Sequence, residues 1–146
     1  MKLAIIALAA SAAALSAAAV STTALAAKTS PLAIPGPPPG TGLPSGQCFR
    51  TRDIRNHTIA DRDTLLVSVK DKDVYRIGVK GCLAGAVSSD PIITRNPPGS
   101  EIICRPIDMD LAIGHTGGGF ATHCIVDSIS KLSPEQVAAL PRKLRP

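Results

Sequence analysis

Two stretches near the middle of the chain alternate between apolar and polar residues, which is the pattern of half-buried β-strands. They read TLLVSVK at residues 64–70 and VYRIGVK at residues 74–80, and the short polar link DKD joins them. The positions that share one apolar face are Leu65, Val67, Val69, Tyr75, Ile77 and Val79. Because the link is so short, the pattern predicts an antiparallel hairpin with this face turned toward a core.

Further strands are predicted on both sides of this hairpin. Residues 48–61 (CFRTRDIRNHTIAD) indicate one bent strand or two short ones, and residues 101–105 (EIICR) indicate a strand that follows a loop rich in proline turn signals. Residues 107–113 alternate cleanly, and residues 123–132 (HCIVDSISKL) predict the last strand. The positions of 107–113 expected to face inward are Ile107, Met109, Leu111 and Ile113.

One helix is predicted near the C-terminus, in the sequence LSPEQVAAL at residues 132–140. Ser133 is its N-cap, Pro134 takes the first helical position and Gln136 completes a capping box. Pro141 ends the helix after two turns. Short strands at regular spacing with a single short helix predict a mainly β fold, either a small antiparallel sheet or a partly closed barrel.

The N-terminal segment is expected to lie outside this fold. Residues 1–26 combine a charged start, an uncharged Ala-rich run and an Ala-Leu-Ala cleavage pattern, which are typical of a secretory signal peptide cleaved near Ala26. An uncleaved membrane anchor is the alternative. Residues 27–47 are dense in proline and glycine and predict a disordered tether, followed by a folded domain at 48–140 and a basic, flexible tail at 141–146. The mature chain is expected to be periplasmic or secreted, with no transmembrane segment.

The four cysteines all fall inside the predicted domain: Cys48, Cys82, Cys104 and Cys124. Their spacing fits neither a CxxC redox pair nor the close ligand pairs of a zinc site. An even number of cysteines in a small exported domain predicts two structural disulfides. Sequence alone leaves three connectivities open. We expect Cys82–Cys104, which would close the loop at 83–100, and Cys48–Cys124, which would join the first strand to the last.

The formal net charge of +5 does not indicate nucleic-acid binding, because the excess lies outside the predicted domain. Within residues 47–140 eleven basic residues face eleven acidic ones, and the remaining basic residues sit in the two terminal segments. Arg50 and Arg52 share one face of a strand, which is interpreted as a solvated face. A single-strand binder would also need exposed aromatic residues, and the whole chain has two Phe, one Tyr and no Trp.

The segment GHTGGGFATHC at residues 114–124 is the strongest candidate for chemistry. It lacks the Lys and hydroxyl residue of a phosphate-binding loop, and the chain has no G-x-S-x-G nucleophile motif, so neither nucleotide binding nor esterase-type catalysis is indicated. A turn between two strands explains its glycines. His115 and His123 flank that turn and are candidate ligands for zinc or copper, with Cys124 or Asp110 as a third ligand. No catalytic residue and no cofactor is predicted.

Four segments in order carry a resemblance to a known family: CFRTRDIRNHTIADRDTLLVSV, YRIGVKGCLAG, IICRPIDMDL and THCIVDSISKLSPEQV. Together with the N-terminal segment they resemble a family of small exported proteobacterial proteins catalogued as a domain of unknown function, over residues 48–140. The chain departs from that pattern in its long proline-rich segment and in the step Leu83-Ala84-Gly85. The resemblance implies a periplasmic or secreted β domain and carries over no catalytic residue.

These observations favour a disulfide-linked β domain that acts as a non-enzymatic binding or envelope-associated module. Its partner would be an envelope or extracellular protein or a small ligand. A metal-handling protein that uses His115 and His123 is the alternative, and a small hydrolase or an inhibitor of one is the second alternative. Because the chain presents no nucleophile, base and orienting group in a recognisable set, the interpretation leans away from an enzyme.

Overall fold

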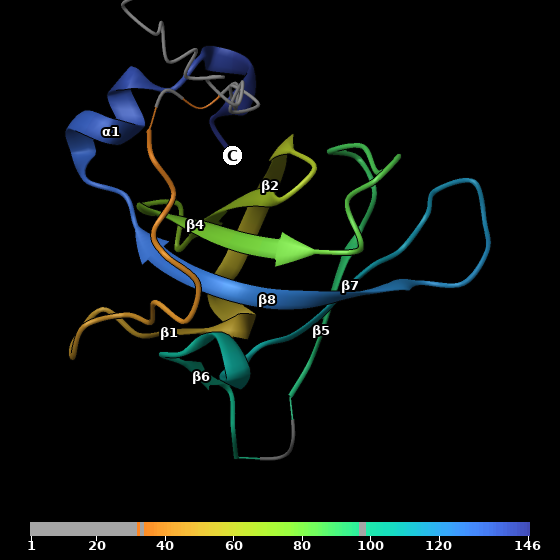
Figure 1. Cartoon of the computed structure of the whole chain (residues 1–146), viewed down its shortest axis with the longest axis horizontal. Coiled ribbons are helices and arrows are strands. Elements are labelled where there is room, and N and C mark those ends of the chain that lie inside the picture. The colour runs from red at the N-terminus through yellow and green to blue at the C-terminus, as the bar shows by residue number, and fades with distance from the viewer. Residues whose placement is uncertain (1–31, 33, 97–98) are drawn as a thin grey trace, which may run out of the picture.

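The computed structural model describes residue 32, residues 34–96 and residues 99–146 (Figure 1). The predicted signal peptide at 1–26 and the start of the predicted tether lie outside the described residues. Among the helices that the structure describes, none is long and apolar enough to cross a membrane.

The described residues form a mainly β fold in which a six-stranded antiparallel sheet curls into a half-barrel (Figure 1). Its strand order is β2-β3-β4-β8-β7-β5, and β1 pairs separately with β6. The strands are β1 (Phe49–Arg50), β2 (Ile54–Asp61), β3 (Thr64–Val69), β4 (Asp73–Lys80), β5 (Ile92–Arg95), β6 (Ile102–Ile103), β7 (Asp110–Ile113) and β8 (Thr122–Lys131). The helical elements are α1 (Pro134–Ala139) and three 3₁₀ turns, η1 (Thr51–Asp53), η2 (Pro106–Asp108) and η3 (Arg142–Leu144).

The predicted hairpin is confirmed as β3 and β4, with Val69 opposite Asp73. Its turn places Lys70 and Asp71 at φ 54°, the left-handed region that Asp tolerates better than most residues. All six positions of the predicted apolar face are buried in the main core. Alternate residues of the same strands face the other side of the sheet, where Leu66 and Val74 enter a second cluster.

That second cluster explains where the C-terminal helix packs. α1 begins at the predicted capping box, in which the Gln136 backbone N–H donates to the Ser133 hydroxyl and the Gln136 side chain accepts from the Ser133 backbone N–H. Leu132, Leu140 and Leu144 cover the outer face of β3 and β4. The last of these lies in η3, so residues 141–146 are not the flexible tail that composition predicts: an apolar side chain buried at 5% exposure holds them.

Two strand predictions need correction. Ile107 was expected to face inward, but it lies in η2 and is 83% exposed, because the alternating strand begins only at β7. A strand was also missed, since β5 forms within a segment whose Asp-Pro and Asn-Pro-Pro-Gly signals predict turns. β5 contributes four residues to the edge of the sheet and pairs with β7. The turn signals flank β5 and do not lie within it, and its own sequence IITR is rich in β-branched residues, so the signals mark the two ends of a strand.

The second half of the predicted tether, residues 34–47, does not extend away from the domain; we call it the strap. The Gly40 N–H donates to the Asp127 carbonyl at 2.6 Å, and the Thr41 carbonyl accepts from the Ile129 N–H at 2.9 Å. On one side of β8, β7 pairs with the first residues of the strand alone, so the second half of β8 has an open edge on that side. The strap satisfies two of those backbone groups, and this is one physical reason that a proline-rich segment is ordered.

The disulfide pairing predicted from sequence is wrong. The bridges are Cys48–Cys104 and Cys82–Cys124, with Cα–Cα distances of 4.7 and 4.9 Å. Strand pairing explains both. Cys48 precedes β1 and Cys104 follows β6, and these two strands are partners. Cys82 follows β4 and Cys124 lies on β8, which are neighbours in the sheet. Each bridge therefore joins adjacent strands and none closes the loop at 83–100.

Candidate functional site

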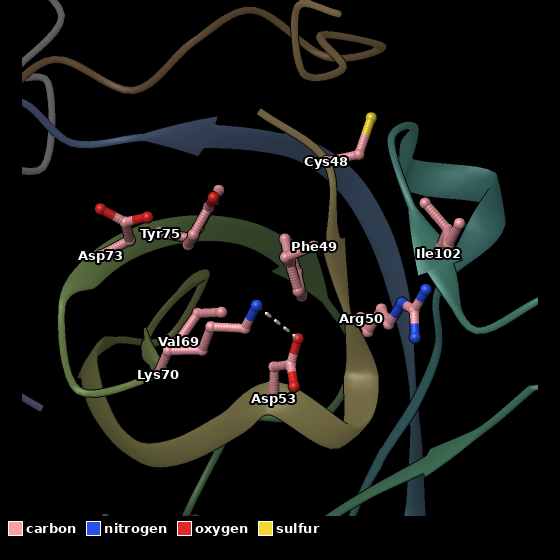
Figure 2. A pocket seen from close by; sticks show the side chains of 9 residues that line it. All are labelled: Cys48, Phe49, Arg50, Asp53, Val69, Lys70, Asp73, Tyr75 and Ile102. Carbon is pink, nitrogen blue, oxygen red and sulfur yellow. Dashed lines mark ion pairs between the residues drawn. The ribbon is translucent and has the colours of Figure 1, made fainter. Parts of the chain in front are cut away.

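A hollow of about 300 Å³ opens beside β1, at the end of the sheet where the β3–β4 turn lies (Figure 2). We call it the β1 hollow. Its walls come from β1, η1, β6 and the two strands of the central hairpin. Segments far apart in the sequence therefore meet in one place, and the Cys48–Cys104 bridge, with a sequence separation of 56, fixes β1 and β6 at its side.

The floor of the β1 hollow is aromatic and well packed. The rings of Phe49 and Tyr75 lie 4.6 Å apart between centroids and are tilted by 44°. Both residues are buried, so their rings form the base of the hollow and expose little surface to it. The Tyr75 hydroxyl donates a hydrogen bond to the Gln47 carbonyl at 3.0 Å, and burial raises the pKa of Tyr75. This phenol therefore stays neutral and ties the strap to β4.

The rim of the hollow is charged, and most of its charges are paired. Lys70 lies 3.4 Å from Asp53, and Figure 2 shows this ion pair across the hollow. Asp73, the second carboxylate of the lining, lies 2.9 Å from Lys131, which does not itself line the hollow, and that hydrogen bond raises the pKa of Lys131. Arg50 has no ion pair and no side-chain hydrogen bond among the described residues. The hollow therefore carries one cation without a counter-charge.

The neighbours of Arg50 give this cation an apolar setting. Ile102, which is 52% exposed, stands beside it across the β1–β6 pair (Figure 2). A smaller hollow of about 190 Å³ continues past these two residues toward Glu101. Arg52, two residues along, turns elsewhere and forms an exposed pair with Glu101 at 3.5 Å. The two arginines assigned to one solvated face therefore differ: one is paired and the other borders a hollow.

The candidate metal ligands His115 and His123 are held by different carboxylates. His115 Nδ1 lies 3.8 Å from Asp90, and His123 Nδ1 lies 3.7 Å from Asp110. The other ring nitrogen of His115 is 3.1 Å from the Thr122 hydroxyl. Within the described part of the chain, no group of three or more His, Cys, Asp or Glu side chains could hold a metal ion. Cys124, the other suggested ligand, is taken up in a disulfide.

Asp90, which the sequence pattern does not single out, is a buried residue at the centre of a part-buried hydrogen-bond cluster. Its carboxylate accepts from the Thr116 N–H at 3.0 Å, from the Thr116 hydroxyl at 2.7 Å and from the Val87 N–H at 3.1 Å. These bonds, those of Thr116 first, lower the pKa of Asp90 to about 2. Its backbone carbonyl lies 2.8 Å from His57 Nε2 on β2. Asp90 thus fastens the β4–β5 connection, the glycine-rich loop and the edge strand β2 together.

The glycine-rich segment itself is a connection between β7 and β8, as predicted. Gly118 and Gly119 adopt φ values of 84° and 120°, which is why glycine is required there, whereas Gly117 does not have a positive φ. Phe120 at the end of the turn is 97% exposed. The segment is therefore a turn held by Asp90, and the charged hollow lies elsewhere in the fold.

Sequence reasoning missed the β1 hollow because its residues have no shared motif. One signal was present: Phe49 and Tyr75 are two of only three aromatic residues in the chain, and Arg50 follows the first of them directly.

Comparison with known proteins gives one match. A family model described as "Family of unknown function (DUF6491)" covers residues 1–146. No curated protein and no solved structure matches the chain.

Proposed function

The chain belongs to this family of unknown function, and we propose that it is a non-enzymatic binding module whose β1 hollow takes a small organic anion with an apolar body. The observation that carries the proposal is Arg50, a cation without a counter-charge at the rim of a hollow with an apolar floor. Because the family description names no activity, the support comes from geometry and charge.

A carboxylate is the group that Arg50 suits best. A guanidinium presents its N–H groups in one plane and can meet both oxygens of a carboxylate. The other cation that lines the hollow, Lys70, already has a carboxylate partner in the chain, Asp53. A ligand anion therefore meets one open cation and displaces no internal ion pair.

The size and lining of the hollow limit the rest of the ligand. A volume of about 300 Å³ is at the lower end for small-molecule sites, so it suits one ring or a short chain. An apolar group over Ile102 would remove exposed hydrocarbon from water, which is favourable. An aromatic monocarboxylate of the size of benzoate combines both features.

The proposed location is an oxidising compartment, either the periplasm or the extracellular space. Two features support it: all four cysteines are in disulfides, and the first 26 residues have the composition of a secretory signal. Disulfides form and persist in exported proteins and are rare in the cytosol of most cells. A binding module in that compartment meets free organic acids from outside the cell, which fits the proposed ligand class.

The test is a titration of the oxidised protein, labelled with ¹⁵N, with benzoate and separately with benzamide as the neutral control. We expect saturable amide shifts around Arg50 and Ile102 with benzoate only. Arg50→Gln should weaken binding by about tenfold, the loss typical of a charged hydrogen bond. Arg52→Gln is the matched control, because Arg52 lies on the same segment, pairs with Glu101 and does not line the hollow.

Two results would overturn the proposal. One is the absence of saturable shifts with benzoate at millimolar concentration. The other is equal weakening by Arg50→Gln and Arg52→Gln, since that would reduce the effect to a general attraction between the protein and an anion.

A further inference from the structure

A second hollow, of about 400 Å³, lies between α1, the β3–β4 turn and the end of β8. We call it the α1 hollow. It is separated from the β1 hollow by Asp73, whose side chain borders both and is paired with Lys131. Figure 1 shows α1 standing over the end of the sheet where β8 finishes.

The walls of the α1 hollow are aliphatic. Val74 and Leu132 form its inner side and belong to the cluster that α1 covers, and Val137 of α1 packs against the same cluster. Ala138 borders it with an exposed small side chain. Among the described residues that line this hollow there is no aromatic ring, in contrast to the β1 hollow, so a flexible alkyl chain fits it better than a flat ring.

The rim of the α1 hollow has more positive than negative charge. Lys72, Lys131 and Arg145 border it against a single carboxylate, Asp73. Asp73 neutralises Lys131, whereas Lys72 has no ion pair among the described residues. Arg145 is fixed in place, because its Nε donates to the Leu140 carbonyl at 3.1 Å and its Nη2 to the Ala138 carbonyl at 2.7 Å. Two cations are thus left to face a bound anion.

We propose that the α1 hollow is a binding site for an anionic single-chain amphiphile, an alkyl phosphate whose chain lies on Val137 and Leu132 and whose phosphate meets Lys72 and Arg145. A phosphate monoester carries between one and two negative charges near neutral pH, which matches the excess of two cations. The short alkyl chain covers aliphatic surface that water now touches, and the helix that forms the wall is held by its own N-cap. This site is independent of the function proposed for the β1 hollow.

The experiment titrates the oxidised protein with hexyl phosphate, followed by amide shifts in ¹⁵N spectra and by calorimetry. Inorganic phosphate and hexanol are the two half-ligand controls. We expect saturable binding of hexyl phosphate, with either half-ligand about tenfold weaker or worse, since each lacks one of the two contact types. The shifts should centre on residues 72–74 and 131–138.

A matched pair of variants decides whether the hollow is the site. Ala138→Phe places a ring in the hollow and should weaken hexyl phosphate binding by about tenfold. Ala139→Phe adds the same ring at the next exposed position of α1, which does not border the hollow, and should leave the affinity unchanged. Lys72→Gln should weaken binding by about threefold, against no change for the exposed Lys143→Gln.

The proposal is overturned if hexyl phosphate fails to saturate, if both Phe variants weaken it equally, or if inorganic phosphate binds as well as the alkyl ester. Loss of hexyl phosphate binding in Arg50→Gln would also overturn it, because the ligand would then occupy the β1 hollow. Retained binding in Arg50→Gln, together with lost benzoate binding, supports two separate sites.

Discussion

Removal of the Cys48–Cys104 bridge tests how much of the stability of this fold depends on that disulfide. The double variant Cys48→Ser/Cys104→Ser opens a loop with a sequence separation of 56 residues. The entropy of an open chain of that length corresponds to about 4 kcal/mol of lost unfolding free energy at 25 °C. Few native contacts replace the bridge, because β1 and β6 share only two residue pairs. We therefore expect the full loss in urea unfolding followed by far-UV circular dichroism.

A second pair of variants distinguishes the observed connectivity from the one predicted from sequence, Cys82–Cys104 and Cys48–Cys124. Cys82→Ser/Cys124→Ser also removes one bridge and should cost about 4 kcal/mol, since its loop has a sequence separation of 42 residues. Cys48→Ser/Cys124→Ser takes one cysteine from each bridge and leaves two unpaired thiols. It should be much less stable than either single-bridge variant. If it were as stable as they are, Cys48 and Cys124 would be partners and the pairing described here would be refuted.

Peptide mapping without reduction tests the same connectivity directly. Trypsin alone is insufficient, because Pro106 follows Arg105 and leaves Cys104 and Cys124 on one peptide. A second protease that cuts before Asp separates them at Asp108 and Asp110. The expected products are fragment 29–50 linked to 96–107 and fragment 81–89 linked to 110–126. A link between 81–89 and 96–107 would contradict the structure.

Four further variants test the Asp90 cluster, the core and the helix cap by urea unfolding, which for Asp90→Asn is repeated across a range of pH. The ionised Asp90 stabilises the fold fully above about pH 4, its unfolded pKa, and this contribution is lost as the pH falls toward its native pKa of about 2. The difference in unfolding free energy between Asp90→Asn and the unmodified protein should therefore shrink over that interval. A difference that stays constant would contradict the role given to Thr116. Ile129→Ala, at a fully buried position, should cost about 2–5 kcal/mol, whereas Ile125→Ala, on the same strand and 70% exposed, should stay within about 0.5 kcal/mol. Ser133→Ala should cost about 1 kcal/mol through the lost cap, and no change would show that the capping bond is not formed in solution.

Sequence patterns correctly predicted those elements of the fold that are determined by residues close together in the sequence. The alternation in 64–80 identified the central hairpin and its buried face, because a strand with one face on a core must alternate. The capping box located α1, since the Ser and Gln that form it are three residues apart. The glycines at 118 and 119 marked a turn because of their backbone conformation. In each case the residues that decide the structure are close in sequence.

The misassigned parts depend on residues that are far apart in sequence. β5 is stabilised by pairing with β7. The strap is ordered because β8 extends beyond the residues that pair with β7 and leaves backbone groups there for the strap to bond. The open edge of β8 is not visible in the strap sequence, which reads as Pro- and Gly-rich. Burial of Leu144 likewise depends on an outer face of the sheet that only the folded chain creates. The β1 hollow belongs with these, since it gathers one or two residues each from β1, η1, β3, β4 and β6.

The disulfide pairing and the β1 hollow are two aspects of one arrangement. β1 is only two residues long, and consecutive residues on a strand point to opposite sides. Phe49 therefore turns into the core against Tyr75, and this orientation places Arg50 on the outside beside Ile102. Core packing of Phe49 and the bond from the preceding residue, Cys48, to the segment that carries β6 together hold so short a strand in this orientation. The cation that defines the proposed anion site is thus positioned in part by a bond that forms and persists under oxidising conditions, which joins the proposed binding function to the proposed location outside the cytosol.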